Sequence, residues 1–80
     1  MTGQVAPNEV AHVVGANIRA RRLQLGLTQQ ELADRIGTYD SHVSAIESGS
    51  KTISLPNLAV WANGLETTAA ALLREPKKSA

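Results

Sequence analysis

Two short segments in the middle of the chain, residues 28–37 and 38–49, carry apolar side chains at helical spacing. The apolar positions are Leu32, Ala33 and Ile36 in the first segment and Val43 and Ile46 in the second. Each segment therefore has one face to bury, whereas its opposite face is polar. We expect two short amphipathic helices joined by a tight turn.

The residues at the ends of these segments favour the same boundaries. Thr28 is a good N-cap, and Glu31 three residues later completes a capping box. Gly37 suits the position after a helix that requires positive φ, and Gly49 ends the second helix. Two helices with such a turn form the unit that inserts its second helix into the major groove of DNA.

Apolar residues at helical spacing predict a longer helix before this pair. It begins at Pro7 or at Asn8, which are equally good starts, and Gly26 ends it. Gly15 inside this helix costs about 1 kcal/mol relative to Ala, so we expect another helix to approach closely there. The polar side of the helix carries Arg19, Arg21 and Arg22.

The segment after Gly49 predicts a loop and two more helices. Ser54 is the expected N-cap of the fourth helix, with Pro56 in its first turn. Thr67 or Thr68 can cap a short fifth helix, and Pro76 prevents its extension. We expect a loose arm at residues 1–7, one all-α domain at residues 8–75 and a disordered tail at residues 76–80.

The central residues carry a family resemblance. GLTQQELADRIG (residues 26–37), followed by IESG (46–49), resembles the Cro/CI-type (XRE-like) helix-turn-helix proteins without gaps from about Val14 to Leu73. The way in which that motif docks on DNA is known from repressors of this kind. The resemblance implies a five-helix, lambda-repressor-like DNA-binding domain that usually acts as a dimer.

The sequence also resembles a subgroup of that family, the controller proteins of restriction-modification systems. The resemblance lies in HVSAIESG and in SKTISLPNLAVWANGL (residues 50–65), with departures at Gly64 and Glu66, where relatives tend to have Ala and Gly. Such dimers bind operators upstream of their own gene and the endonuclease gene. Two alternatives are a phage-type repressor and an antitoxin that neutralises a toxin protein.

With Val43 and Ile46 turned inward, the second helix of the motif presents an outward face that matches the base-reading positions of the family. That face comprises Asp40, Ser41, Ser44, Ala45 and Ser48, with His42 beside it and Tyr39 at the tip. Thr28 and Gln29 match positions at which the preceding helix meets a phosphate, and Lys51 and Thr52 fit further phosphate contacts. The alternative is that these side chains only form solvated surface.

Asp40 and the pair Arg22 and Glu47 require a separate interpretation. Asp40 stands where relatives carry Gln or Arg, and we favour a helix-capping role for it over a base contact, because Tyr39 occupies the usual cap position. The resemblance implies a structural salt bridge between Arg22 and Glu47. Arg22 is also a candidate for a phosphate contact through its remaining donors.

The C-terminal apolar residues predict a dimer interface, because they exceed what a short fifth helix needs internally. The candidate residues are Leu65, Ala69, Ala70, Leu72 and Leu73. The alternative is that all of them complete the core of the monomer.

Composition restricts the remaining possibilities. Eighty residues suit one domain, and the net charge of +1 means that the distribution of basic residues matters more than their sum. The absence of Cys and the lack of a leader or membrane-spanning pattern favour a cytoplasmic protein.

His12 and His42 have no neighbours in sequence that predict a metal site or catalysis. We therefore expect no cofactor, no enzymatic activity and no small-molecule ligand. The small number of aromatic residues gives no platform on which single-stranded bases could stack, so we expect double-stranded DNA as the partner.

Overall fold

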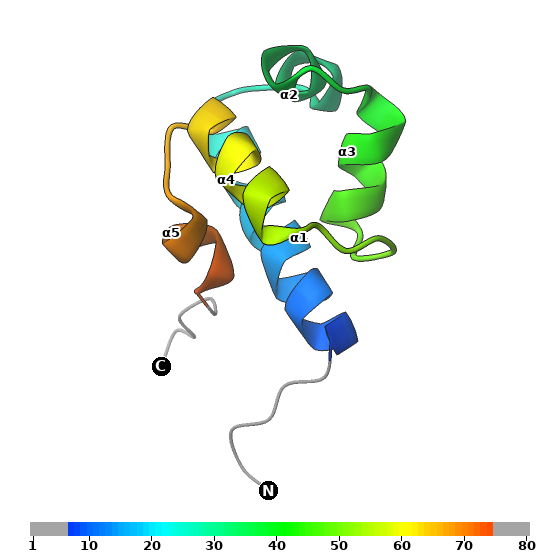
Figure 1. Cartoon of the computed structure of the whole chain (residues 1–80). Helices are drawn as coiled ribbons and strands as arrows, with labels where there is room; N and C mark the ends of the chain where they lie inside the picture. Colours follow the sequence, from blue (N-terminus) through cyan, green and yellow to red (C-terminus); the bar gives the residue numbers. More distant parts are fainter. Residues whose placement is uncertain (1–6, 75–80) are drawn as a thin grey trace, which may run out of the picture.

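Five α-helices follow one another in the computed structural model, which describes residues 7–74 (Figure 1). They are α1 (Pro7–Gln24), α2 (Gln29–Ile36), α3 (Asp40–Glu47), α4 (Leu55–Gly64) and α5 (Ala69–Leu73). Residues 7–74 contain no strand, which confirms the expected all-α class. The predicted arm and tail lie outside the described residues, except Pro7, which begins α1.

Helices α2, α4 and α5 begin at the capping residues that the sequence predicts. The backbone N–H of Glu31 donates to Thr28 Oγ1 (3.0 Å), and the N–H of Thr28 donates to Glu31 Oε1 (2.8 Å), so the capping box of α2 is complete. Gly37 ends α2 with a φ of 79°, in the left-handed region that glycine adopts without strain. Ser54 and Thr68 accept hydrogen bonds as the N-caps of α4 and α5.

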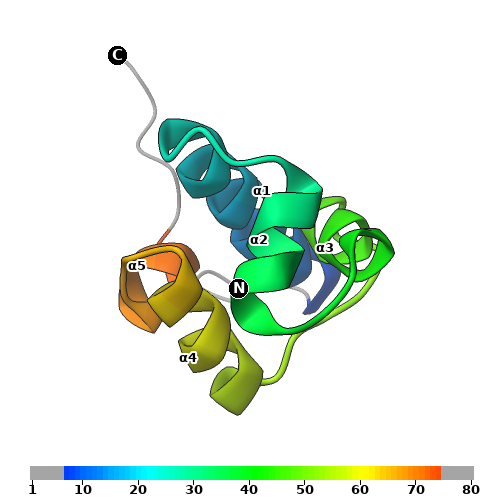
Figure 2. The ribbon, with the colours of Figure 1, turned by 90° about the horizontal axis from the view of Figure 1, so that it is seen from above.

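Helix α1 is the central support of the fold. It contacts α3 on one side and α5 on the other, and α2 joins α3 to α4 (Figures 1 and 2). The helices enclose a single cluster of buried side chains: Val14, Ile18, Leu32, Ala33, Val43, Ile46, Leu58, Trp61, Ala62, Leu65 and Leu72. Because this cluster draws on all five helices, the orientation of α3 depends on the whole domain.

The contact between α1 and α3 is close at Gly15, as the sequence predicted. A Cβ at this position would meet the carbonyl oxygen of Ile46 and, at 2.6 Å, that of Glu47. Both atoms belong to the backbone of the last turn of α3, so they cannot rotate away as a side chain can. Gly15 therefore sets the distance between α1 and α3.

Two polar side chains of α1 fasten the C-terminal part of the domain. Arg21 donates to the turn between α4 and α5, and Asn17 donates to the end of α5. The acceptors are the carbonyl oxygens of Leu65 (2.9 Å) and Glu66 (3.0 Å) for Arg21, and of Leu72 (2.8 Å) and Arg74 (2.7 Å) for Asn17. These bonds satisfy carbonyl groups that helix ends leave without partners. None of the helices between residues 7 and 74 is long and apolar enough to cross a bilayer.

Candidate nucleic-acid interface

Helix α3 has one face in the core and one in solvent. Val43 and Ile46 are 0% and 1% exposed, whereas Asp40, Ser41, Ser44 and Ser48 are exposed and Ala45 is half-buried. The outward face predicted from the sequence is therefore present in the fold. Its side chains are small and polar, which lets the helix backbone approach another surface closely.

The start of α3 differs from the sequence prediction. The N-cap is Tyr39, whose backbone is extended (φ −129°, ψ 161°) and whose side chain makes no capping hydrogen bond. Asp40 is the first helical residue, so the capping role that we favoured for it is wrong. A side chain caps a helix from the extended residue before it, and Tyr39 already holds that place. The Asp40 carboxylate stays in solvent at the positive end of the helix dipole.

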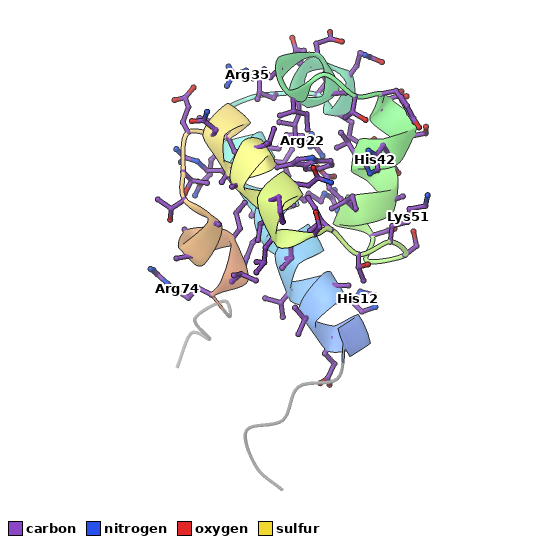
Figure 3. All side chains as sticks on the ribbon, in the orientation of Figure 1. His12, Arg22, Arg35, His42, Lys51 and Arg74 are labelled. Atoms are coloured by element: carbon purple, nitrogen blue, oxygen red, sulfur yellow. The ribbon has the colours of Figure 1, made fainter. Side chains whose placement is uncertain are left out.

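His42 points from α3 toward α4 instead of outward (Figure 3). Its Nδ1 lies 2.9 Å from Thr38 Oγ1, and its ring meets the edge of Trp61 with a centroid separation of 5.4 Å. Edge-to-face ring pairs of this geometry are favourable beyond the area that they bury. His42 therefore braces α3 against α4, at the side of the outward face. The other histidine, His12, lies on α1 against Gly49, in separate surroundings.

Arg22 and Glu47 form a two-point ion pair inside the motif. Arg22 Nε donates to Glu47 Oε2 (2.6 Å) and Arg22 Nη2 donates to Glu47 Oε1 (3.0 Å), while Arg22 Nη1 donates to the carbonyl of Leu27 (2.7 Å). The two side chains are only 8% and 4% exposed. All three nitrogens of Arg22 are thus engaged inside the protein, which makes its role structural and leaves it poorly placed for a phosphate.

The hydrogen bonds to Glu47 raise the pKa of Arg22 above its usual value, against the opposing effect of burial. The stability that this raised pKa contributes is fully present at pH values below the ordinary pKa of arginine. It is lost only as the pH rises through the raised pKa of Arg22. Arg22 therefore stays charged at any pH at which the protein works. Gln29 Nε2 also donates to Glu47 Oε1 (3.0 Å), so the start of α2 is tied to the end of α3.

A polar hollow lies on each side of α3. The first, of about 230 Å³, is lined by Arg19, Arg22, Gln29, Ser44, Glu47 and Ser48. The second, of about 340 Å³, is lined by Tyr39, Ser41, His42, Ala45 and Lys51. Arg19 and Lys51 are exposed and form no hydrogen bond or ion pair with other side chains in the described part of the chain. Each hollow therefore has one available positive charge.

Arg19 was absent from the residues that the sequence assigned to DNA binding. A signal was available, because Arg19 and Arg22 are three residues apart and share one face of a helix. Since Arg22 reaches α3, Arg19 one turn earlier also lies beside it. Of the predicted phosphate contacts, Thr28, Lys51 and Thr52 are exposed.

The predicted dimer interface is only partly at the surface. Leu65 and Leu72 are 0% and 2% exposed in the core of the monomer, so their assignment to a dimer interface is wrong. Both side chains belong to the buried core cluster, and their backbone carbonyls accept hydrogen bonds from α1. Ala69 packs partly against the core, and Ala70 and Leu73 are exposed.

The fold and the motif match known proteins. A family model described as helix-turn-helix matches residues 18–72. The hypothetical transcription factor NHTF from Neisseria is 30% identical, with a TM-score of 0.81 over 95% of this chain and 87% of that chain. The controller protein C.AhdI from Aeromonas hydrophila is 31% identical, with a TM-score of 0.73 over 78% and 94% of the two chains.

A second restriction-modification controller protein, C.Esp1396I, was solved as a tetramer in complex with its natural 35 base-pair operator. It is 27% identical to this chain, with a TM-score of 0.72 over 79% of this chain and 83% of that chain. The family model covers more than two thirds of the 80 residues. The chain is therefore a member of the Cro/CI-type (XRE-like) helix-turn-helix family.

Proposed function

We propose that this protein is a transcriptional regulator that binds double-stranded DNA as a homodimer, with α3 in the major groove. One observation carries the proposal: α3 exposes a row of small polar side chains, and a solvent-exposed cation lies on each side of it, Arg19 in one hollow and Lys51 in the other. Phosphate contacts position a protein on DNA, and base contacts read the sequence. The exposed face of α3 and the two cations beside it provide side chains for both kinds of contact in one surface.

Two copies are needed for useful affinity, because one helix-turn-helix makes few phosphate contacts. Dimers of this motif place two recognition helices in successive major grooves, about 34 Å apart. We propose a palindromic or nearly palindromic operator with half-sites at that spacing. Ser41, Ser44 and Asp40 are the side chains that we assign to base edges; a carboxylate accepts a hydrogen bond from the cytosine amino group.

The regulator type that we favour is the controller of a restriction-modification system that acts on its own promoter. The resemblance of residues 42–65 to such controllers, and the similarity to C.AhdI and C.Esp1396I, support this assignment. A phage-type repressor would share the same surface. The DNA that the protein prefers distinguishes the two possibilities.

The test is a salt-titrated binding assay with the DNA upstream of the protein's own gene and a scrambled duplex of equal length. We expect two chains per site and selective binding to the native DNA. Ser44→Asp adds a negative charge to the outward face of α3 and should weaken binding at least about tenfold by repulsion from phosphates. The matched control Asn63→Asp adds the same charge to an exposed position of α4 and should bind as the wild type does.

Equal and weak binding of the wild type to both duplexes, with the same affinity for Ser44→Asp and Asn63→Asp, would contradict the proposed function. Selective binding to an operator of another gene, instead of the protein's own upstream DNA, would keep the regulator and exclude the self-acting controller.

A further inference from the structure

The second polar hollow beside α3 contains two basic side chains. It measures about 340 Å³, and its lining includes His42 from α3 and Lys51 from the loop that follows α3 (Figure 3). Tyr39, Ser41 and Ala45 complete the lining, so none of the residues around the hollow carries a carboxylate. A lysine, a histidine and hydroxyl groups around one depression have the chemistry to hold an anion.

One nitrogen of the His42 ring is held by the protein, and the other is available. Nδ1 lies 2.9 Å from Thr38 Oγ1. Nε2 has no hydrogen-bond partner among residues 9–74. It nevertheless reaches solvent, because no buried side-chain nitrogen in that part of the chain lacks a partner. Nε2 is therefore free to donate a hydrogen bond to an anion in the hollow.

The position of the His42 ring does not depend on its charge. The Thr38 hydroxyl can donate to an unprotonated Nδ1 or accept from a protonated one, so this contact is kept in both forms of the ring. The contact with Trp61, at an interplanar angle of 81°, fixes the plane of the ring. His42 can therefore gain a proton without leaving the hollow.

The groups that surround His42 include no carboxylate partner. Helix α4, which packs against the ring through Trp61, contains no titratable residue. Tyr39, with a centroid separation of 6.0 Å, and Lys51 face the ring from the segments on either side of α3. On α3 itself, Asp40 is exposed, and His42 forms no ion pair within residues 9–74. A bound phosphate would therefore be the negative charge that this hollow lacks.

DNA supplies phosphates at the place where the hollow lies. The hollow borders the outward face of α3, and Ser41 belongs to both. A helix in the major groove has a phosphate backbone beside it, and basic side chains at its edges contact that backbone. An anion within about 4–6 Å of a histidine favours the charged form of the ring. DNA binding is then accompanied by the uptake of a proton.

We propose that the second polar hollow holds a DNA phosphate between Lys51 and the protonated ring of His42, so that affinity for DNA rises as the pH falls through the neutral range. This inference rests on the proposed function and specifies how it depends on pH. Histidine is the side-chain type that ordinarily changes charge between pH 5 and pH 8. The chain has two histidines, and the other one, His12, lines neither of the polar hollows beside α3.

The first test measures affinity for duplex DNA at pH 8 and at pH 6, at constant salt. The wild-type affinity should rise at least about tenfold, because a neighbouring opposite charge shifts a proton equilibrium by about one pH unit or more. His42→Gln replaces the ring by a neutral amide and should lose this dependence. His12→Gln makes the same change at the other histidine and should keep it. Circular dichroism at both pH values shows whether the variants are folded.

The second test needs no substitution at the hollow. In protein with ¹⁵N-labelled histidine, addition of DNA at pH 7 should move the ring nitrogen signals of His42 toward those of a charged ring and leave those of His12 in place. The spectrum of His12→Gln assigns the two sets of signals. The inference is overturned by a wild-type affinity that is equal at pH 6 and pH 8, by a dependence that persists in His42→Gln, or by His42 signals that do not move.

The comparison of two duplexes separates this inference from the proposed function. Phosphate contacts carry no sequence information, so the native and scrambled duplexes should show the same pH dependence. Selective binding that does not change with pH would keep the regulator and overturn the phosphate site. Equal binding to both duplexes that strengthens at low pH and requires His42 would support the phosphate site and contradict the regulator.

Discussion

Glu47 holds three parts of the motif at once, since it accepts hydrogen bonds from Arg22 on α1 and from Gln29 on α2. Its side chain is 4% exposed, so the protein covers nearly all of its surface. The residue therefore orients α3 without touching a ligand.

Glu47→Ala should lower the free energy of unfolding by about 3–5 kcal/mol, because the variant leaves the Arg22 guanidinium buried without its partner. The comparison is Arg35→Ala, which removes the exposed pair with Glu66 (3.1 Å) and should cost less than about 1 kcal/mol. Urea denaturation measures both. Equal losses in the two variants would show that burial of the Arg22 pair adds no stability.

Gly15→Ala tests the close contact between α1 and α3. In an open helix this change stabilises by about 1 kcal/mol, yet here the new Cβ meets backbone oxygens of Ile46 and Glu47. We expect a loss of about 3 kcal/mol, since overpacking against atoms that cannot rotate forces the helices apart. Ala16→Gly, at an exposed position of the same helix, should cost about 1 kcal/mol. A stabilised Gly15→Ala variant would mean that α1 and α3 can separate freely.

Helix α3 begins with a less favourable cap than α2, α4 or α5, because Tyr39 gives no side-chain hydrogen bond where the others have Thr or Ser. Natural proteins keep such weak points when the residue serves binding. Tyr39 is 66% exposed at the tip of the outward face, where it can contact DNA.

Tyr39→Ser should be about 1 kcal/mol more stable than Tyr39→Ala, because serine supplies the missing cap and both variants lose the same ring. Both should bind operator DNA more weakly than the wild type. Thermal unfolding and the operator assay give the two results. Wild-type affinity in both variants would exclude a DNA contact by Tyr39, and equal stability of the two would mean that α3 starts at another residue.

The helix boundaries could be predicted because the signals for them are local. Thr28, Gly37 and Ser54 act on residues within one turn, so the sequence around each is enough to identify it. The inward face of α5 could not be predicted in this way, because five residues hold too little periodicity to distinguish core from surface. Leu72 was misassigned for that reason, whereas Leu65 lies outside α5, as the C-cap of α4.

The surroundings of His42 could not be predicted from spacing alone. His42 meets Trp61, a residue of another helix, and the packing of α3 on α4 decides the direction of the ring. Asp40 is not the cap of α3, because the extended backbone that an N-cap requires lies at Tyr39, and residue type alone does not indicate this. The outward face of α3 was predictable, since Val43 and Ile46 fix its opposite side. Its contacts with DNA stay predictions.

The charge of the molecule as a whole is small, so its arrangement must determine how DNA binding depends on salt. Arg19→Ala and Lys51→Ala should each weaken binding to all duplexes and reduce the slope of log affinity against log salt by about one. Arg74→Ala, at the end of α5, removes the same charge far from α3 and should leave the slope unchanged. Equal slopes for all three variants would place the phosphate contacts elsewhere.

Asn17 and Arg21 fasten the end of the domain by binding its backbone carbonyls and no side chains of that region. Every amino acid supplies the same carbonyl, so the docking of α5 does not depend on which residues occupy exposed positions such as Ala70 and Arg74. Evolution is thus free to vary this outer surface while α1 keeps it in place. Related proteins can therefore differ at these positions without any change in the outward face of α3.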